Sequence, residues 1–80
     1  NTNLNERVRV GATVKVIREL RGLTQDQLAS AATMSRSQLA NIEAGRKTLS
    51  KLALARVATA LAVPAVAIKH DDPSDQSVAA

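Results

Sequence analysis

The sequence contains no cysteine and no phenylalanine, tryptophan or tyrosine. The lack of cysteine excludes disulfides and cysteine-ligated zinc sites, and a single histidine, His70, cannot hold a metal by itself. A core without aromatic side chains must be built from Leu, Ile, Val, Met and many alanines, which suits closely packed helices. No apolar run approaches the length of a membrane span, and the N-terminus has no apolar block like that of a signal peptide. We therefore expect a soluble, intracellular protein without a metal or a cofactor.

The charge is unevenly distributed along a chain that is long enough for one small domain and one core. The net charge is +4, yet residues 71–80 carry three aspartates and no Lys or Arg. All 11 Lys and Arg residues and 4 of the 7 acidic residues lie in residues 1–70, so this part carries +7. A basic body with an acidic end favours an anionic partner such as nucleic acid. A merely solvated charged surface explains the charge equally well.

Two helix starts, eleven residues apart, organise the middle of the chain. Thr24 is followed three residues later by Gln27, and Ser35 by Gln38, which is the spacing of a capping box. Apolar residues at helical spacing follow each start, Leu28 and Ala32 after the first and Leu39 and Ile42 after the second, and Met34 falls in the turn between them. Gly45 stands where a helix end favours a positive φ. The pattern predicts two short helices joined by a tight turn, a helix-turn-helix.

The stretch from Thr24 to Gly45 resembles the DNA-binding motif of the Cro and phage-repressor type of helix-turn-helix family. The matching features are the opening Gln25, the small Ala29 at the helix crossing, the Ser-Arg-Ser start at 35–37 and the Ile-Glu-x-Gly ending at 42–45. The resemblance extends more loosely over residues 10–66. It implies an all-α fold, a compact bundle of five short helices like the lambda-repressor DNA-binding domain. The domain would span residues 1–70, with the motif at 24–44.

Thr33 departs from this family pattern, which usually has glycine in the turn. A β-branched residue is costly in the left-handed region. We therefore expect either a regularised turn or a Thr33 that stays helical and shifts the bend.

The remaining helices follow from apolar spacing and local stop signals. The first is predicted to begin between Glu6 and Val10 and to end at Arg21 before Gly22, leaving residues 1–6 as a mobile arm. Its apolar face comprises Val10, Val14, Ile17 and Leu20. Ser50 should cap a fourth helix from Lys51 to about Leu61, whose inward residues are Leu54, Val57, Ala58 and Leu61.

A fifth, short helix is predicted from Pro64 to about Lys69, with Pro64 in its first turn and Val66 and Ala67 facing inward. Four apolar residues remain, and they either complete the core or form the seam of a homodimer: Leu49, Leu52, Val63 and Ile68. Residues 71–80 read as a disordered acidic tail.

The second helix of the motif is the candidate recognition helix for a DNA major groove. With Leu39 and Ile42 turned inward, helical geometry leaves these base-reading candidates outside: Arg36, Ser37, Ala40 and Asn41. Arg36 suits a bidentate pair with guanine, and Asn41 suits one with adenine. Ser37 could serve a base or a phosphate. Ala40 could meet a thymine methyl, although simple spacing explains an alanine as well.

Phosphate contacts are expected where the motif begins and ends. The candidates are Gln25, Ser35, Arg46, Lys47 and Thr48. Ordinary capping is the alternative for Gln25, and a solvated basic loop is the alternative for Arg46 and Lys47. The family resemblance also implies a buried or half-buried pair between Arg18 and Glu43 that ties the first helix to the third, as opposed to two independent surface charges.

The resemblance implies a sequence-specific regulator of transcription that binds double-stranded DNA. It favours a phage or prophage-type repressor that binds a palindromic operator as a homodimer and is nucleoid-associated in the cytoplasm. An enzyme is not expected, because the carboxylates are scattered and no catalytic group is visible. The alternative is a protein-interaction module, or an antitoxin-like component with the same fold.

Overall fold

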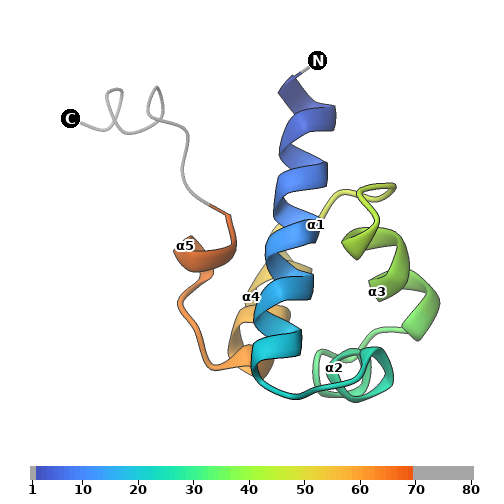
Figure 1. Ribbon diagram of the computed structural model, residues 1–80, viewed down its shortest axis with the longest axis vertical. Helices are drawn as coiled ribbons and strands as arrows, with labels where there is room; N and C mark the ends of the chain where they lie inside the picture. The colour runs from blue at the N-terminus through green and yellow to red at the C-terminus, as the bar shows by residue number, and fades with distance from the viewer. Residues whose placement is uncertain (1, 70–80) are drawn as a thin grey trace.

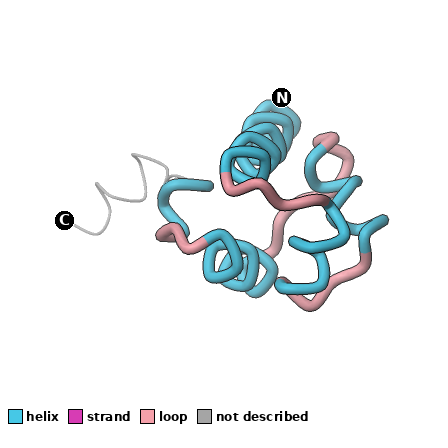
Figure 2. The backbone as a smooth tube through the Cα atoms, turned by 60° about the horizontal axis from the view of Figure 1, so that its bottom comes forward, coloured by secondary structure: helices cyan, strands magenta, loops and turns pink. Residues whose placement is uncertain are grey.

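The computed structural model describes residues 2–69, which form five helices. They are α1 (Thr2–Leu20), α2 (Gln25–Ala31), α3 (Arg36–Glu43), α4 (Lys51–Leu61) and α5 (Ala65–Ile68). α1 runs through the middle, with α2 and α3 on one side of it, α5 on the other and α4 behind (Figures 1 and 2). No strand is present in this part of the chain, so the predicted all-α bundle of five helices is confirmed. The predicted tail at 71–80 and His70 lie outside the described residues.

α1 begins earlier than the sequence predicted. The expectation of a mobile arm up to Glu6 is wrong for residues 2–6, which are the first residues of the helix. No Gly or Pro interrupts this segment, and adding residues to an existing helix costs little compared with starting one. The consequence is that Arg7 and Val8 lie in regular helix.

The apolar face of α1 is also narrower than predicted. Val10 and Val14 are buried and Ile17 packs partly against the core, but Leu20 is 81% exposed. Leu20 lies about 1.7 turns beyond Val14, so it points to a different side of the helix. The side of the last turn that faces the domain is instead occupied by Arg18, which is buried.

The core contains no aromatic side chain and draws on every helix. Its buried members are Val10, Val14, Leu28, Ala29, Ala32, Leu39, Ile42, Leu49, Ala53, Val57, Ala58, Leu61 and Ile68. On α4, Leu54 is only partly buried, and the predicted inward residues Val57, Ala58 and Leu61 are buried.

The four unassigned apolar residues separate into two groups. Leu49 and Ile68 complete the core and Val63 packs against it, whereas Leu52 is exposed. The prediction that α5 turns Val66 and Ala67 inward is wrong, because both are exposed and Ile68 is buried. Pro64 is extended and stands before α5 as its N-cap, so the helix also starts one residue later than expected.

Local caps determine where α2, α3 and α4 begin. Thr24 accepts the backbone N–H of Gln27, and the Gln27 side chain accepts the N–H of Thr24, so the predicted capping box is present. At α3, Ser35 accepts the N–H of Gln38, but within residues 2–69 the reciprocal half of the box is not formed. Ser50 accepts the N–H of Ala53 at the start of α4.

The turn between α2 and α3 is made by Thr33 in the left-handed conformation, at φ 59°. Both expectations for this residue are wrong, because the turn is neither regularised nor shifted. The Thr33 N–H donates to the Ser30 carbonyl at 3.2 Å, and the Met34 N–H donates to the Ala29 carbonyl at 2.9 Å. These two bonds form the Schellman arrangement that normally ends a helix with glycine. They satisfy backbone groups and place Met34 against the core, which offsets the strain at Thr33.

Candidate nucleic-acid interface

The exposed side of the motif is the outer face of α3. Leu39 and Ile42 are buried, which turns the opposite side of the helix outward. Of the predicted base readers, Arg36 and Ser37 are exposed and Ala40 and Asn41 are half-buried. The structure therefore brings all four to one face, with Arg36 and Ser37 in the first turn.

Within residues 2–69 no helix is both long enough and apolar enough to cross a membrane.

Arg36 has an acidic neighbour that the sequence analysis missed. Its Nε lies 3.7 Å from Oδ1 of Asp26, which is in the first turn of α2. Both side chains are largely exposed, at 66% and 75%, so the ion pair adds little stability. The signal was present in the sequence, because Asp26 is three residues before Ala29, which the family resemblance places at the crossing of the two helices.

Asn41 organises the loop that follows α3. Its Oδ1 accepts a hydrogen bond from Nε of Arg46 at 3.0 Å, and its backbone carbonyl accepts the N–H groups of Arg46 and Lys47. A carbonyl oxygen has two lone pairs, so Oδ1 can still accept from a base while Nδ2 donates to it. The side chain of Asn41, a candidate base reader, and the position of the basic loop are therefore physically linked.

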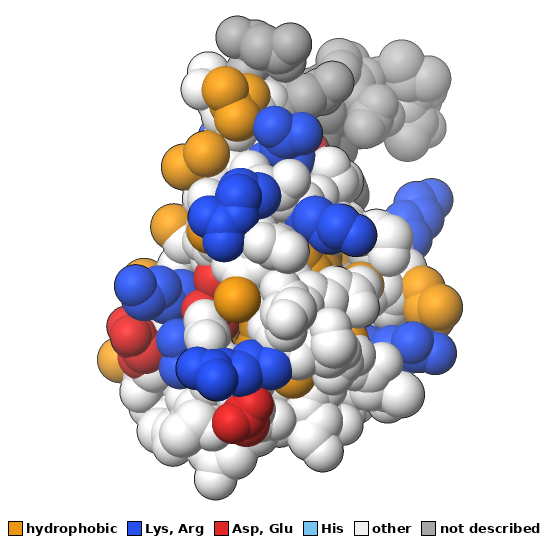
Figure 3. Space-filling model, turned by 90° about the vertical axis from the view of Figure 1, so that its right-hand side faces the viewer, with side chains coloured by type: hydrophobic (Ala, Val, Ile, Leu, Met, Phe, Trp, Pro, Cys, Tyr) orange, Lys and Arg blue, Asp and Glu red, His pale blue; other side chains and the backbone are white. Residues whose placement is uncertain are grey.

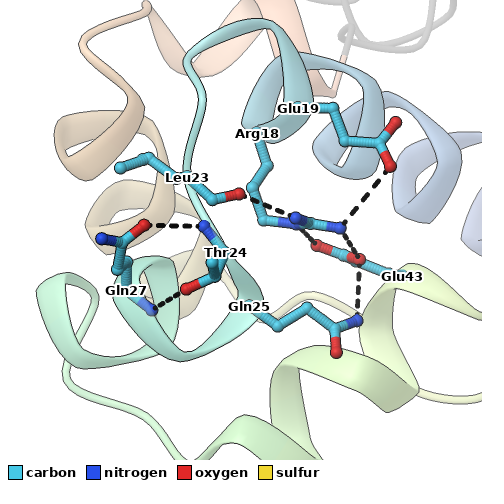
Figure 4. A network of polar contacts seen from close by, with 7 residues as sticks. All are labelled: Arg18, Glu19, Leu23, Thr24, Gln25, Gln27 and Glu43. Carbon is cyan, nitrogen blue, oxygen red and sulfur yellow. Dashed lines mark hydrogen bonds and ion pairs between the residues drawn. The ribbon is translucent and has the colours of Figure 1, made fainter.

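A buried polar network fixes α3 relative to α1 and α2 (Figure 4). Arg18 donates from Nε to Oε2 of Glu43 at 2.7 Å and from Nη2 to Oε1 at 3.1 Å. Its Nη1 donates to the carbonyl oxygen of Leu23 at 2.8 Å. Arg18 and Glu43 are 8% and 9% exposed, so each charge depends on the other. The hydrogen bond to Glu43 raises the pKa of Arg18 above its ordinary value, against the opposing effect of burial.

Gln25 joins this network. Its Nε2 donates to Oε1 of Glu43 at 3.1 Å. A carboxylate can only accept, so the amide nitrogen must face Glu43. Thr24 and Gln27 make the cap of α2, whereas the side chain of Gln25 donates to Glu43, so capping of α2 is not the role of this side chain. Ser35, by contrast, uses its hydroxyl oxygen as the cap of α3.

The loop candidates Arg46, Lys47 and Thr48 are all exposed. They follow Gly45, which ends α3 at φ 80° and packs against Val8 of α1. Figure 3 shows the side of the molecule that carries α2 and α3, where Lys and Arg side chains spread over much of the surface and Asp and Glu are few. The motif thus combines a polar helix face, a basic loop and a rigid support.

Comparisons with known proteins agree with this geometry. Residues 9–70 match a protein family described as a helix-turn-helix domain. The chain is 49% identical over 63 residues to the immunity repressor protein of Bacillus phage phi105. That match covers 79% of this chain but 44% of the relative, so the chain spans less than half of its length.

Two solved structures extend the comparison. The restriction-modification controller protein C.AhdI from Aeromonas hydrophila has a TM-score of 0.78 at 26% identity, covering 80% of this chain and 97% of that one. The clp gene regulator ClgR from Corynebacterium glutamicum has a TM-score of 0.74 at 34% identity, covering 78% and 80%. The resemblance inferred from residues 24–45 is thereby confirmed, and the chain belongs to the helix-turn-helix domain family.

Proposed function

We propose that this domain binds double-stranded DNA in a sequence-specific manner and regulates transcription as a repressor, as a homodimer on a palindromic operator. The observation that carries the proposal is the outer face of α3, which presents Arg36, Ser37 and Asn41 beside the basic loop 46–48. The names of the relatives support it: one is an immunity repressor, one a restriction-modification controller and one a gene regulator. The same family and fold favour a regulatory protein over an enzyme.

Base reading is assigned to the first turns of α3. An α-helix fits the major groove of B-DNA, where each base pair has a distinct donor and acceptor pattern. The guanidinium of Arg36 matches O6 and N7 of guanine, and the amide of Asn41 matches N6 and N7 of adenine. Each such pair gives roughly 1–3 kcal/mol of discrimination. Ser37 lies beside Arg36 as a hydroxyl for a base or phosphate, and Ala40 leaves room for a thymine methyl.

Phosphate contacts are assigned to the edges of the motif. The cations of Arg46 and Lys47 and the hydroxyl of Thr48 would hold one strand after α3. The free N–H of Gln25 and the hydroxyl of Ser35 would hold the backbone near the starts of α2 and α3. Such contacts set position and carry no sequence information themselves. Because Glu43 accepts a hydrogen bond from Gln25, the start of α2 is tied to the end of α3, where the basic loop begins.

Dimerisation follows from the small size of one recognition surface. Specific complexes usually bury more protein surface than one short helix supplies. A two-fold dimer would place two copies of α3 about 34 Å apart, on successive major grooves. Occupancy of such a site blocks transcription without any chemical step, which is consistent with a site built only from binding groups.

Selection of bound duplexes from a random pool at near-physiological salt tests this function. We expect enrichment of a palindrome whose half-sites are centred about one helical turn apart. Binding of all duplexes alike, with affinity that disappears as salt rises, would contradict sequence-specific recognition. The fold would then be better explained as a protein-interaction module or an antitoxin-like component.

A further inference from the structure

α3 ends in a Schellman motif, and this motif places Arg46 beside Asn41. The N–H of Arg46 donates to the carbonyl oxygen of Asn41 at 2.9 Å. Between them Gly45 has φ 80°, and its N–H donates to the carbonyl oxygen of Ile42 at 3.0 Å. In this motif the residue after the left-handed position commonly contacts the side chain five residues back, usually through apolar groups. The backbone that ends α3 therefore brings the side chain of Arg46 to that of Asn41.

The same motif ends α1, α2 and α4, and there the corresponding residue is apolar. This residue is Leu23 after α1, Met34 after α2 and Val63 after α4, and each donates its N–H to the carbonyl five residues back. All three side chains pack against the core. Arg46 differs from them because it is charged and exposed. Ending a helix in this way does not require an arginine, so another property of the side chain explains its presence.

Arg46 supplies a hydrogen bond to the side chain of Asn41. Its Nε donates to Oδ1 of Asn41 at 3.0 Å. Nε can only donate, so this bond requires the amide oxygen of Asn41 to face the loop and the amide nitrogen to face away. The terminal torsion of an asparagine is otherwise broad, with two roughly equivalent amide orientations. The bond to Arg46 therefore selects one orientation before any DNA is bound.

We propose that Arg46 is a positioning residue for base reading, which holds the Asn41 amide in the orientation that adenine requires and also contacts a backbone phosphate. Adenine accepts at N7 and donates from N6, so each end of the amide must face the correct atom. The bond to Asn41 uses Nε, on the arginine stem, and does not use the four N–H groups of Nη1 and Nη2. One guanidinium thus joins a phosphate contact to a base contact. This inference rests on the proposed DNA-binding function and adds specificity to a residue assigned there to phosphate.

Arg46→Lys separates the two roles, because lysine keeps the positive charge but has no donor on its stem. Affinities are measured for the selected operator, for operators changed at each base pair and for an unrelated duplex. The base pair read by Asn41 is the one at which Asn41→Ala loses its preference. We expect Arg46→Lys to reduce the preference at that base pair by about three- to tenfold, the effect of one hydrogen bond. Affinity for the unrelated duplex should fall much less, by about twofold at most.

Two controls show whether this effect is local. Arg46→Lys should retain the preference at the base pair that Arg36→Ala affects, because Arg36 lies at the other end of α3. Arg56→Lys makes the same change at an exposed site on α4 and should keep all affinities within about twofold. Loss of preference at both base pairs, together with a lower Tm, would show that Arg46 supports the whole helix. That outcome would overturn its specific role toward Asn41.

Combining Arg46→Lys with Asn41→Ala tests whether one residue acts through the other. Once the amide is removed, Arg46 has nothing to position, so Arg46→Lys should change the base preference no further in the Asn41→Ala background. Additive losses of preference from the two substitutions would overturn the positioning role.

NMR relaxation of the Asn41 side-chain amide in the free protein tests the positioning without DNA. The amide should be ordered in the wild-type protein and more mobile on the ps–ns timescale in Arg46→Lys. Equal mobility in the two proteins, or full base preference in Arg46→Lys, would overturn the inference alone. Failure of the wild-type protein to select any operator would instead overturn the proposed function, even with an ordered amide.

Discussion

Arg18 and Glu43 show how strongly a single buried charge can depend on its partner. Each is less than a tenth exposed, and two hydrogen bonds join them. Removing one member of such a pair leaves the other as an uncompensated buried charge. Arg18 keeps its proton at every pH below its raised pKa. The positive charge of the pair, and the stability that depends on it, are therefore lost only in strong alkali.

Glu43→Gln should therefore lower the free energy of unfolding by about 3–5 kcal/mol. The amide cannot accept both Arg18 N–H groups and the Gln25 N–H as the carboxylate does. Glu19→Gln is the control, because Glu19 lies 4.0 Å from the same guanidinium but its side chain is 57% exposed. Urea unfolding should give at most about 1 kcal/mol for the control. Similar losses in the two variants would show that the buried pair is not important for stability.

Arg36→Ala should relax sequence preference at one base pair per half-site without unfolding the domain. The side chain is 66% exposed and its ion pair with Asp26 is long, so the fold does not depend on it. Binding to operators with every base changed in turn should show a loss of roughly 1–3 kcal/mol of discrimination at that base pair. Arg56→Ala, an exposed site on α4, is the control and should keep the wild-type preference. An equal loss of affinity for all sequences would mean that Arg36 contacts only phosphate.

At the scale of single elements, the turn between α2 and α3 has backbone strain that a single substitution can relieve. Thr33 is β-branched and has φ 59°, a conformation that costs non-glycine residues about 1–2 kcal/mol. Thr33→Gly should raise the free energy of unfolding by up to about 1 kcal/mol. The relief of backbone strain in the folded state outweighs the greater conformational entropy that glycine gives to the unfolded chain. Ala55→Gly, in the interior of α4, should lower stability by about 1 kcal/mol. A lower Tm for Thr33→Gly would indicate that the threonine side chain contributes contacts that outweigh the strain.

The contact between α1 and α3 depends on a glycine inside α1. A Cβ on Gly11 would collide with the carbonyl oxygen of Ile42 and lie 2.9 Å from that of Glu43. Backbone atoms cannot rotate away as a flexible side chain can, so α1 and α3 would have to separate. Gly11→Ala should lower the unfolding free energy by about 3 kcal/mol or more, the upper end for overpacking.

Gly22→Ala provides the control for this prediction. A Cβ on Gly22 would meet no atom within 4 Å, so this variant should lose only the roughly 1–2 kcal/mol that its positive φ costs an alanine. Both variants are compared by urea unfolding. Equal losses would mean that the two helices separate easily, and that their close approach is not a requirement of the fold.

At the scale of the whole molecule, the salt dependence of the affinity for DNA reports how many phosphates the protein contacts. This number depends in turn on how many protomers are bound. Log affinity falls as log salt concentration rises, and each lost phosphate contact reduces the magnitude of this slope by about 0.9. Lys47→Ala should weaken binding to all sequences alike and reduce the slope by up to about 0.9 per protomer, hence up to about 1.8 for a dimer. Lys51→Ala, exposed at the start of α4, is the control with the same charge change. An unchanged slope for Lys47→Ala would remove this residue from the phosphate contacts.

The sequence by itself determined the features that depend on neighbouring residues. Thr24, Ser35 and Ser50 cap helices because a hydroxyl can reach an N–H three residues along the chain. Gly22 and Gly45 end helices because glycine adopts positive φ without strain. The outward face of α3 also followed from helical periodicity. These features gave the motif, the family and the positions of the candidate base readers.

Only the tertiary structure decided how those helices touch. The burial of Leu49 and Ile68 and the exposure of Leu52 depend on packing between segments distant in sequence. The hydrogen bond from Gln25 of α2 to Glu43 of α3 is of the same kind. Local sequence rules cannot predict them, because a side-chain contact depends on the distance and angle between two helices.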